Sequence, residues 1–149
     1  MDLQTRLTEE YREYITRIES DESFDFFVIV NPYWNENIRI SLNDDMIFYF
    51  SYHHGHCDYS IEYLIDYINN FICGNWVAIE FFHENTDLFG GARRLEDIDI
   101  SSGDSLLKSF TGDNASLHEH LLKQIKSLNC RCLIRGWNNE YSRDIDFII

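Results

Sequence analysis

The sequence predicts an α+β protein in which a mainly antiparallel sheet carries about three helices. Two short links between consecutive β-rich runs indicate an antiparallel meander. Separate segments show the three- and four-residue spacing of amphipathic helices, and the chain closes with a second hairpin pattern. The expected order is α-β-β-β-α-β-(β)-α-β-β, in a single domain spanning residues 1–149.

The first helix is expected over residues 2–19. Its apolar stripe recurs at helical spacing and consists of Leu3, Leu7, Tyr11, Tyr14, Ile15 and Ile18. Charged side chains fill the other faces. The polar cluster Ser20–Ser23 ends the helix, because such residues favour turns.

Three strands follow in the predicted meander. Residues 24–30 (FDFFVIV) are almost continuously apolar, which is typical of a central strand. A break at Pro32 and a loop over 33–37 lead to residues 38–42, where apolar and polar side chains alternate as in a half-buried strand. A turn at Asn43–Asp45 then leads to a third strand over residues 46–52.

Helical periodicity returns over residues 60–73, with Asp58 or Ser60 as the N-cap and Gly74 at the C-terminal end. Residues 76–82 (WVAIEFF) predict a fourth strand. Residues 88–112 are ambiguous and allow a turn or short strand, an edge strand over 92–100 and a helical turn over 105–110.

The last helix is expected around residues 117–128, capped by Asp113 or Asn114 and ended by Asn129. Residues 130–137 and 143–149 then predict a closing hairpin.

The composition restricts the classes of ligand. The chain has 26 acidic and 12 basic residues, a net charge of −14, and residues 1–66 hold 14 acids and 4 bases, a net charge of −10. Phosphate recognition depends on clustered Lys and Arg, so nucleic acids and anionic membrane surfaces are not expected partners. The hydrophobic fraction of 44% argues against disorder. Without an apolar leader or membrane-spanning stretch, a cytoplasmic location and reduced cysteines are expected.

Residues 53–58 are rich in groups that bind metal ions. His54 and His56 lie two residues apart on an extended chain, next to Cys57, and His83 ends a predicted neighbouring strand. These residue types favour zinc or another transition metal. The alternative is a strand-end loop, rich in hydrogen-bonding groups, that caps the following helix.

Three carboxylates line one ridge of the second predicted helix, because Asp58, Glu62 and Asp66 are spaced by four residues. No basic residue of this helix offsets them, and like charges at this spacing are slightly destabilising. Tyr59 and Tyr63 accompany the ridge, and aromatic residues are frequent interface anchors. The ridge is therefore either a binding surface for a basic partner or an ordinary solvated face.

Loop residues give weaker signals. Trp34 is either packed on the core or exposed as a binding anchor. Asp44 and Asp45 form an acidic turn, where Asp is favoured in any case. Gly90–Gly91 before Arg93 resembles an anion cradle only superficially, because the surrounding residues are acidic.

No pattern of nucleophile and base indicates an enzyme, and no cofactor is expected. The pair of His56 and Cys57 is adjacent in sequence only.

The overall pattern resembles the small acidic cytoplasmic immunity proteins of bacterial polymorphic-toxin systems. An acidic first helix, a strand of the FDFFVIVNP type, a meander and the strand end Tyr52–His56 carry the resemblance, over about residues 1–85. It implies a non-enzymatic protein that neutralises a cognate toxin domain, a basic one of nuclease type, by masking its active surface. The predicted partner-binding residues are Asp58, Glu62, Asp66, Tyr59, Tyr63, Trp34, Asp44 and Asp45. The alternative is a metal-binding protein or metal-dependent enzyme centred on residues 53–58.

Overall fold

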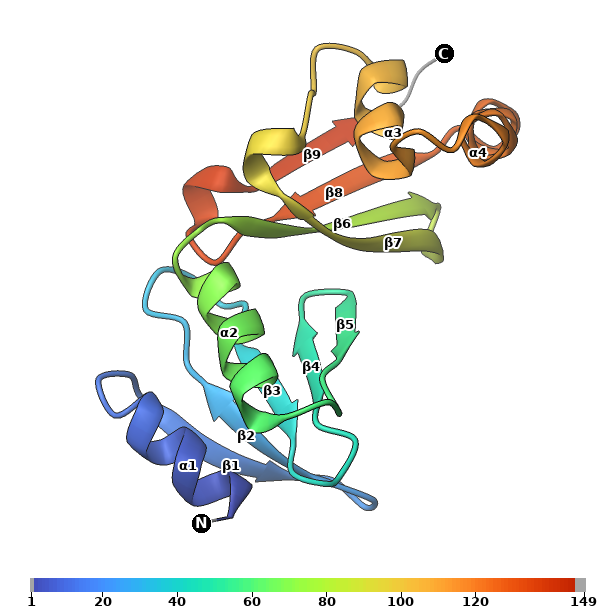
Figure 1. Cartoon of the computed structure of the whole chain (residues 1–149). Coiled ribbons are helices and arrows are strands. Elements are labelled where there is room, and N and C mark those ends of the chain that lie inside the picture. Colours follow the sequence, from blue (N-terminus) through green and yellow to red (C-terminus); the bar gives the residue numbers. More distant parts are fainter. Residues whose placement is uncertain (1, 147–149) are drawn as a thin grey trace.

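The computed structural model describes residues 2–146, which form four α-helices and nine strands in two antiparallel sheets (Figure 1). The α+β class is therefore confirmed. The elements are α1 (Leu3–Glu10), β1 (Thr16–Ser20), β2 (Asp25–Ile29), β3 (Ile38–Ser41), β4 (Ile47–Phe50), β5 (His53–His56), α2 (Ile61–Ile72), β6 (Trp76–His83), β7 (Thr86–Arg94), α3 (Gly103–Thr111), α4 (Ala115–Leu128), β8 (Arg131–Arg135) and β9 (Arg143–Asp146). Short 3₁₀ turns occupy Leu95–Asp97 and Asn139–Tyr141.

The first half of the molecule, α1 to α2, is built on a five-stranded meander in the order β1-β2-β3-β4-β5. Figure 1 shows α1 and α2 against this sheet. Apolar side chains of α1, α2 and the sheet form one core, which includes Leu7, Phe27, Ile29, Ile38, Ile40, Phe48, Phe50, Leu64, Ile68 and Phe71. The predicted meander is confirmed, and one further strand extends it on each side.

The first predicted helix is too long. α1 ends at Glu10, and residues 16–20 form β1, which pairs with β2 from Thr16 opposite Ile29 to Ser20 opposite Asp25. Ile15 and Ile18, which were expected on the buried stripe, are exposed. Pairing with an apolar central strand therefore outweighs helical periodicity in this segment, since β-branched Thr16 and Ile18 suit an edge strand.

The second half, β6 to β9, forms a four-stranded sheet in the order β7-β6-β8-β9. In Figure 1, α3 and α4 lie on the side of this sheet that faces away from the first half. They bury Val77, Ile79, Phe81, Leu106, Leu107, Leu121, Ile125, Cys130, Cys132 and Ile134 in a second core. Within the ambiguous segment 88–112, residues 88–94 belong to one long strand that begins at Thr86, and α3 is a full helix. The closing hairpin is confirmed as far as Asp146; residues 147–149 lie outside the described range.

The strands divide into two sheets, not the single sheet that was expected, and the two halves meet at shared side chains. Trp137, which follows β8, is fully buried in the first core, 6.2 Å from the Phe50 ring. Tyr52, in the turn between β4 and β5, packs edge-on against Phe82 of β6 at 4.8 Å. That the halves behave as a single domain stays a prediction. Within the described residues, no helix has the length and apolar character needed to cross a bilayer.

Candidate functional site

Two of the three predicted ridge carboxylates, Glu62 and Asp66, lie on the outer face of α2, whereas Asp58 precedes the helix. Leu64, Ile65, Ile68 and Phe71 turn the opposite face of the helix into the core. The side chain of Ser60 caps the helix by accepting a hydrogen bond from the Tyr63 backbone N–H at 3.0 Å. Asp58, just before the helix, and Glu62 and Asp66 on it are all exposed. We call Asp58, Tyr59, Glu62, Tyr63 and Asp66 the α2 acidic surface.

The carboxylates of this surface lack cationic partners. Among the described residues, no Lys, Arg or His forms an ion pair with Asp58, Glu62 or Asp66. The nearest influence is Arg6 of α1, whose guanidinium pairs with Glu10 at 2.8 Å. The pKa of Arg6 is raised, mainly by this hydrogen bond with Glu10 and to a smaller extent by the charge of Glu62. The negative charge of the surface is therefore largely uncompensated.

The tyrosines beside the carboxylates form an aromatic row along α2. Tyr59 is 81% exposed and Tyr63 is 43% exposed, and their rings stand edge to face at 5.2 Å. Tyr67 continues the row but is partly buried, and its hydroxyl lies 2.7 Å from Nε2 of His53. Two of the three tyrosines are thus available to a partner, and the third holds α2 on the sheet.

Trp34 is half-buried and packs on the first core. Its indole N–H donates hydrogen bonds to the backbone carbonyls of Gly136 at 3.2 Å and of Trp137 at 3.0 Å, and its ring packs on the first core. It therefore links the two halves, and the core alternative is correct. Asp44 and Asp45 are exposed in the turn between β3 and β4, separate from α2. Their part in binding stays a prediction.

The histidine-rich segment is a strand, β5, and not the expected strand-end loop. Alternation along the strand separates the predicted metal ligands. His54 and His56 are exposed on one face with ring centroids 5.4 Å apart, whereas Cys57 is fully buried on the other. Burial raises the pKa of the Cys57 thiol to about 11, which disfavours the thiolate that binds metals.

His83 belongs to β6 in the other sheet. No group of three or more His, Cys, Asp or Glu in the described part of the chain is arranged to hold a metal ion. The structure therefore does not assemble the predicted set of His54, His56, Cys57 and His83. His53 has a structural position instead, stacked on Tyr67 and Phe71, and burial lowers its pKa to about 4.

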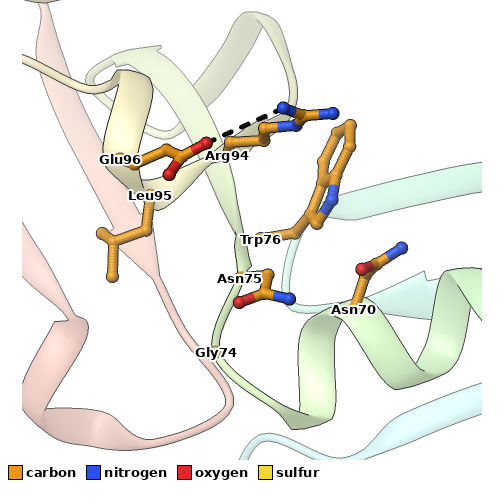
Figure 2. Close-up of a pocket in the computed structure, with 7 residues that line it drawn as sticks. All are labelled: Asn70, Gly74, Asn75, Trp76, Arg94, Leu95 and Glu96. Carbon is orange, nitrogen blue, oxygen red and sulfur yellow. Dashed lines mark ion pairs between the residues drawn. The ribbon is translucent and has the colours of Figure 1, made fainter.

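A pocket of about 580 Å³ lies at the C-terminal end of α2. Its lining consists of Asn70, Gly74, Asn75, Trp76, Arg94, Leu95 and Glu96 (Figure 2). Figure 2 shows the pair of Arg94 and Glu96, 3.7 Å apart, beside the Trp76 indole, with the amides of Asn70 and Asn75 below it. Since Asn70 is one turn beyond Asp66, this polar hollow continues the row of the α2 acidic surface.

A second pocket, of about 330 Å³, lies between the halves and was not predicted. Tyr52, His53 and His54 line it from the first sheet, and Glu80, Asp87 and the segment 88–91 line it from the second. Glu80 is 94% buried although it is a carboxylic acid in the centre of β6. We call this the Glu80 pocket. The sequence contains a signal for this pocket, since Glu80 is the single charged residue in the apolar run WVAIEFF. Two glycines, Gly90 and Gly91, lie opposite this part of the strand on β7.

Comparison of the chain with protein-family models, with curated proteins and with solved structures finds no match.

Proposed function

We propose that the chain is a non-enzymatic binding protein that neutralises a basic protein partner. The partner that fits best is a toxin domain of nuclease type. The chain would then act as an immunity protein that covers the active surface of the toxin. The α2 acidic surface carries the proposal, because it combines two exposed tyrosines with three carboxylates that pair with no Lys, Arg or His in the described part of the chain.

The spacing of the carboxylates lowers the stability of α2, and a binding function explains why it is present. Glu62 and Asp66 are spaced by four residues within α2, and a like-charged pair at this spacing destabilises a helix by a few tenths of a kcal/mol. A basic cleft placed against Asp58, Glu62 and Asp66 removes that repulsion. Complementary charge also steers the encounter and raises the association rate.

The tyrosines supply the short-range part of the contact. Tyr59 and Tyr63 offer flat apolar rings with a polar hydroxyl, the residue type that is enriched among interface hot spots. Their edge-to-face contact pre-orders both rings, so less rotamer freedom is lost on binding. The pocket at Asn70 lies beyond Asp66 and offers a concave place for a partner side chain.

The test uses a candidate toxin domain, the C-terminal domain of the protein encoded immediately upstream. Its affinity is measured by biolayer interferometry for the native chain and for a triple variant, Asp58→Lys, Glu62→Lys and Asp66→Lys. We expect the triple variant to lose at least ~100-fold in affinity and to lose protection of cells that express the toxin. The native complex weakens as salt is raised, because its charges are screened.

The matched control reverses three exposed acids outside the α2 acidic surface: Glu22→Lys, Asp97→Lys and Asp113→Lys. It changes the net charge equally, so we expect only the modest loss that comes from weaker steering. Equal losses in both triple variants contradict the assigned surface. Stoichiometric zinc in the purified chain, lost on replacing His54 and His56 by Ala, contradicts the proposal and supports the metal hypothesis instead.

A further inference from the structure

The Glu80 pocket is built around an acid that the fold leaves without a counter-ion. Glu80 shares its face of β6 with Ala78 and Phe82, the face opposite to the one that α3 and α4 cover. No Lys, Arg or His in the described part of the chain forms an ion pair with Glu80 or Asp87. A buried carboxyl group without a cation is costly, so its retention requires an explanation.

The basic residues of the same sheet face are engaged with another acid. Register places Arg131 opposite Phe82 and Arg135 opposite Ala78, so both arginines flank the strand position of Glu80. Their guanidinium groups pair with Asp144 of β9, at 2.7 Å for Arg131 and 2.6 Å for Arg135. The sheet thus directs its cations away from the pocket.

The backbone opposite Glu80 is shaped to receive the carboxyl group. Gly90 pairs with Glu80 in the ladder, and a Cβ atom at position 90 would collide with the Glu80 carboxylate. Glycine inside a strand weakens it and marks a close approach of another group. β7 therefore contains a glycine where the acid lies, and the acid stays accessible from the pocket.

Asp87 completes an acidic pair. Its carboxylate is exposed at the mouth of the pocket and is hydrogen-bonded to that of Glu80. Burial first, and then this hydrogen bond and the charge of Asp87, raise the pKa of Glu80 to about 8. In the free protein Glu80 is therefore largely protonated at neutral pH, in place of having a counter-ion.

The geometry points to the Glu80 pocket as a binding site for an alkylammonium or alkylguanidinium group, held by Glu80 and Asp87. A bidentate guanidinium satisfies two carboxylates at once. The exposed ring of Tyr52 at the rim offers a face for the cation or its alkyl stem. A bare metal ion fits less well, because no group of three metal-binding side chains is assembled in the described residues. This site is separate from the α2 acidic surface and does not depend on the proposed function.

The experiment titrates butylguanidinium into the ¹⁵N-labelled chain at pH 7 and follows the amide signals of Gly90 and Gly91. We expect saturable shifts at these glycines and none with butylurea, which is a neutral molecule of nearly the same shape. Calorimetry in buffers of different ionisation enthalpy should detect proton release on binding, because the cation displaces the proton that Glu80 holds. The pocket also contains His53 and His54, so the same titration with His54→Gln establishes that the proton comes from the acidic pair.

Two variants test the assigned residues. Glu80→Gln and Asp87→Asn should each weaken butylguanidinium binding at least ~10-fold, since each removes one carboxylate that contacts the cation. Glu84→Gln, in the adjacent turn outside the pocket, carries the same change of charge and should bind normally. Because Asp87 is exposed, its variant should fold even if the Glu80 variant does not.

A last pair of titrations distinguishes the sources of the cation. Agmatine represents a small free cation, and acetyl-Gly-Arg-Gly-amide represents an arginine side chain on a protein. Binding of the peptide assigns the pocket to a protein side chain, and binding of agmatine alone assigns it to a small molecule. Equal binding of butylurea, or unchanged binding in both carboxamide variants, overturns the proposal.

Discussion

The two halves of the molecule place their charge differently. The first half has a net charge of −10 within residues 1–66, whereas residues 67–149 hold 12 acids and 8 bases, a net charge of −4. In the second half, Arg131 and Arg135 share Asp144, and Arg93 donates to the carbonyl of Phe110. In the first half, the α2 acidic surface exposes three carboxylates that have no such partner among residues 2–146 as described. The acidity is therefore a property of one surface more than of the whole chain.

Burial, in contrast, treats the two halves alike. Among the described residues, each half buries one side chain of the His or carboxylic acid type, His53 on β5 and Glu80 on β6. Burial lowers the pKa of His53 to about 4 and raises the pKa of Glu80 to about 8, so both groups are kept neutral at neutral pH. Charge is tolerated only where water reaches it. The comparison of the halves can be tested at their junction, at each buried group and on α2.

The largest effect is expected at Trp137, which follows a strand of the second half but fills the core of the first. Trp137→Ala should lower the free energy of unfolding by about 3–5 kcal/mol, because it removes a large buried ring. Urea unfolding, followed by far-UV circular dichroism and by fluorescence of the remaining tryptophans, should show one coincident transition. Leu106→Ala, in the second core alone, is the control and should also destabilise the protein in a single transition. Two separate transitions would mean that the halves are independent units.

Gly90→Ala should destabilise the second half by about 1–3 kcal/mol, since the added methyl group meets the Glu80 carboxylate. In the background of Glu80→Ala the same substitution should cost much less, because the obstructing group is absent. The measurement is a double-mutant cycle of urea unfolding. An equal cost in both backgrounds would show that the Glu80 carboxylate is not what excludes a side chain at this position.

The two buried groups should give stability opposite dependences on pH. The folded state holds the Glu80 proton more tightly than the unfolded state, so its contribution declines as pH rises from about 4.5 to about 8. The lowered pKa of His53 acts in reverse, and its contribution declines as pH falls from about 6.5 to about 4. Between pH 6.5 and 8, wild type should lose at most about 1.4 kcal/mol per pH unit relative to Glu80→Gln.

His53→Gln supplies the complementary measurement. Between pH 6.5 and 4, wild type should lose stability relative to this variant, with the same upper limit on the slope. Thermal or urea unfolding at closely spaced pH values measures both differences. A stability difference between wild type and either variant that stays constant with pH would contradict the corresponding pKa shift.

The smallest expected effect is on α2. Asp66→Lys replaces a repulsive pair with Glu62 by an attractive pair in the favourable order, so the variant should gain about 0.5 kcal/mol in stability. The same change should weaken binding of a basic partner. Asp97→Lys, outside α2, should leave both quantities nearly unchanged. A gain in stability without a loss of binding identifies the row as an ordinary solvated face.

Local patterns predicted much of this fold. Strands 25–29, 38–41 and 76–83 and the helices α2 and α4 follow from their apolar spacing, and the caps Ser60 and Asn114 lie where their side-chain chemistry places them. The shared exposed face of Glu62 and Asp66 also follows from helical spacing, whereas Asp58 lies before the helix. These features depend on neighbours within one turn or one hairpin, and so the chain specifies them locally.

Other features depend on residues far apart in the chain, and only the tertiary structure decided them. Residues 16–20 are a strand because β2 is available to pair with them. Cys57 points away from His54 because β5 joins a sheet, and Trp34 is structural because the backbone at residues 136–137 accepts its N–H. Glu80 and Asp87 line a pocket only because the turn at Tyr52 packs against the second sheet. The sequence by itself determined β2, β3, β6, α2, α4 and the exposed carboxylates of α2, through short-range periodicity and charge. The further strands, the division into two sheets and the pocket between them required long-range packing, which no local pattern encodes.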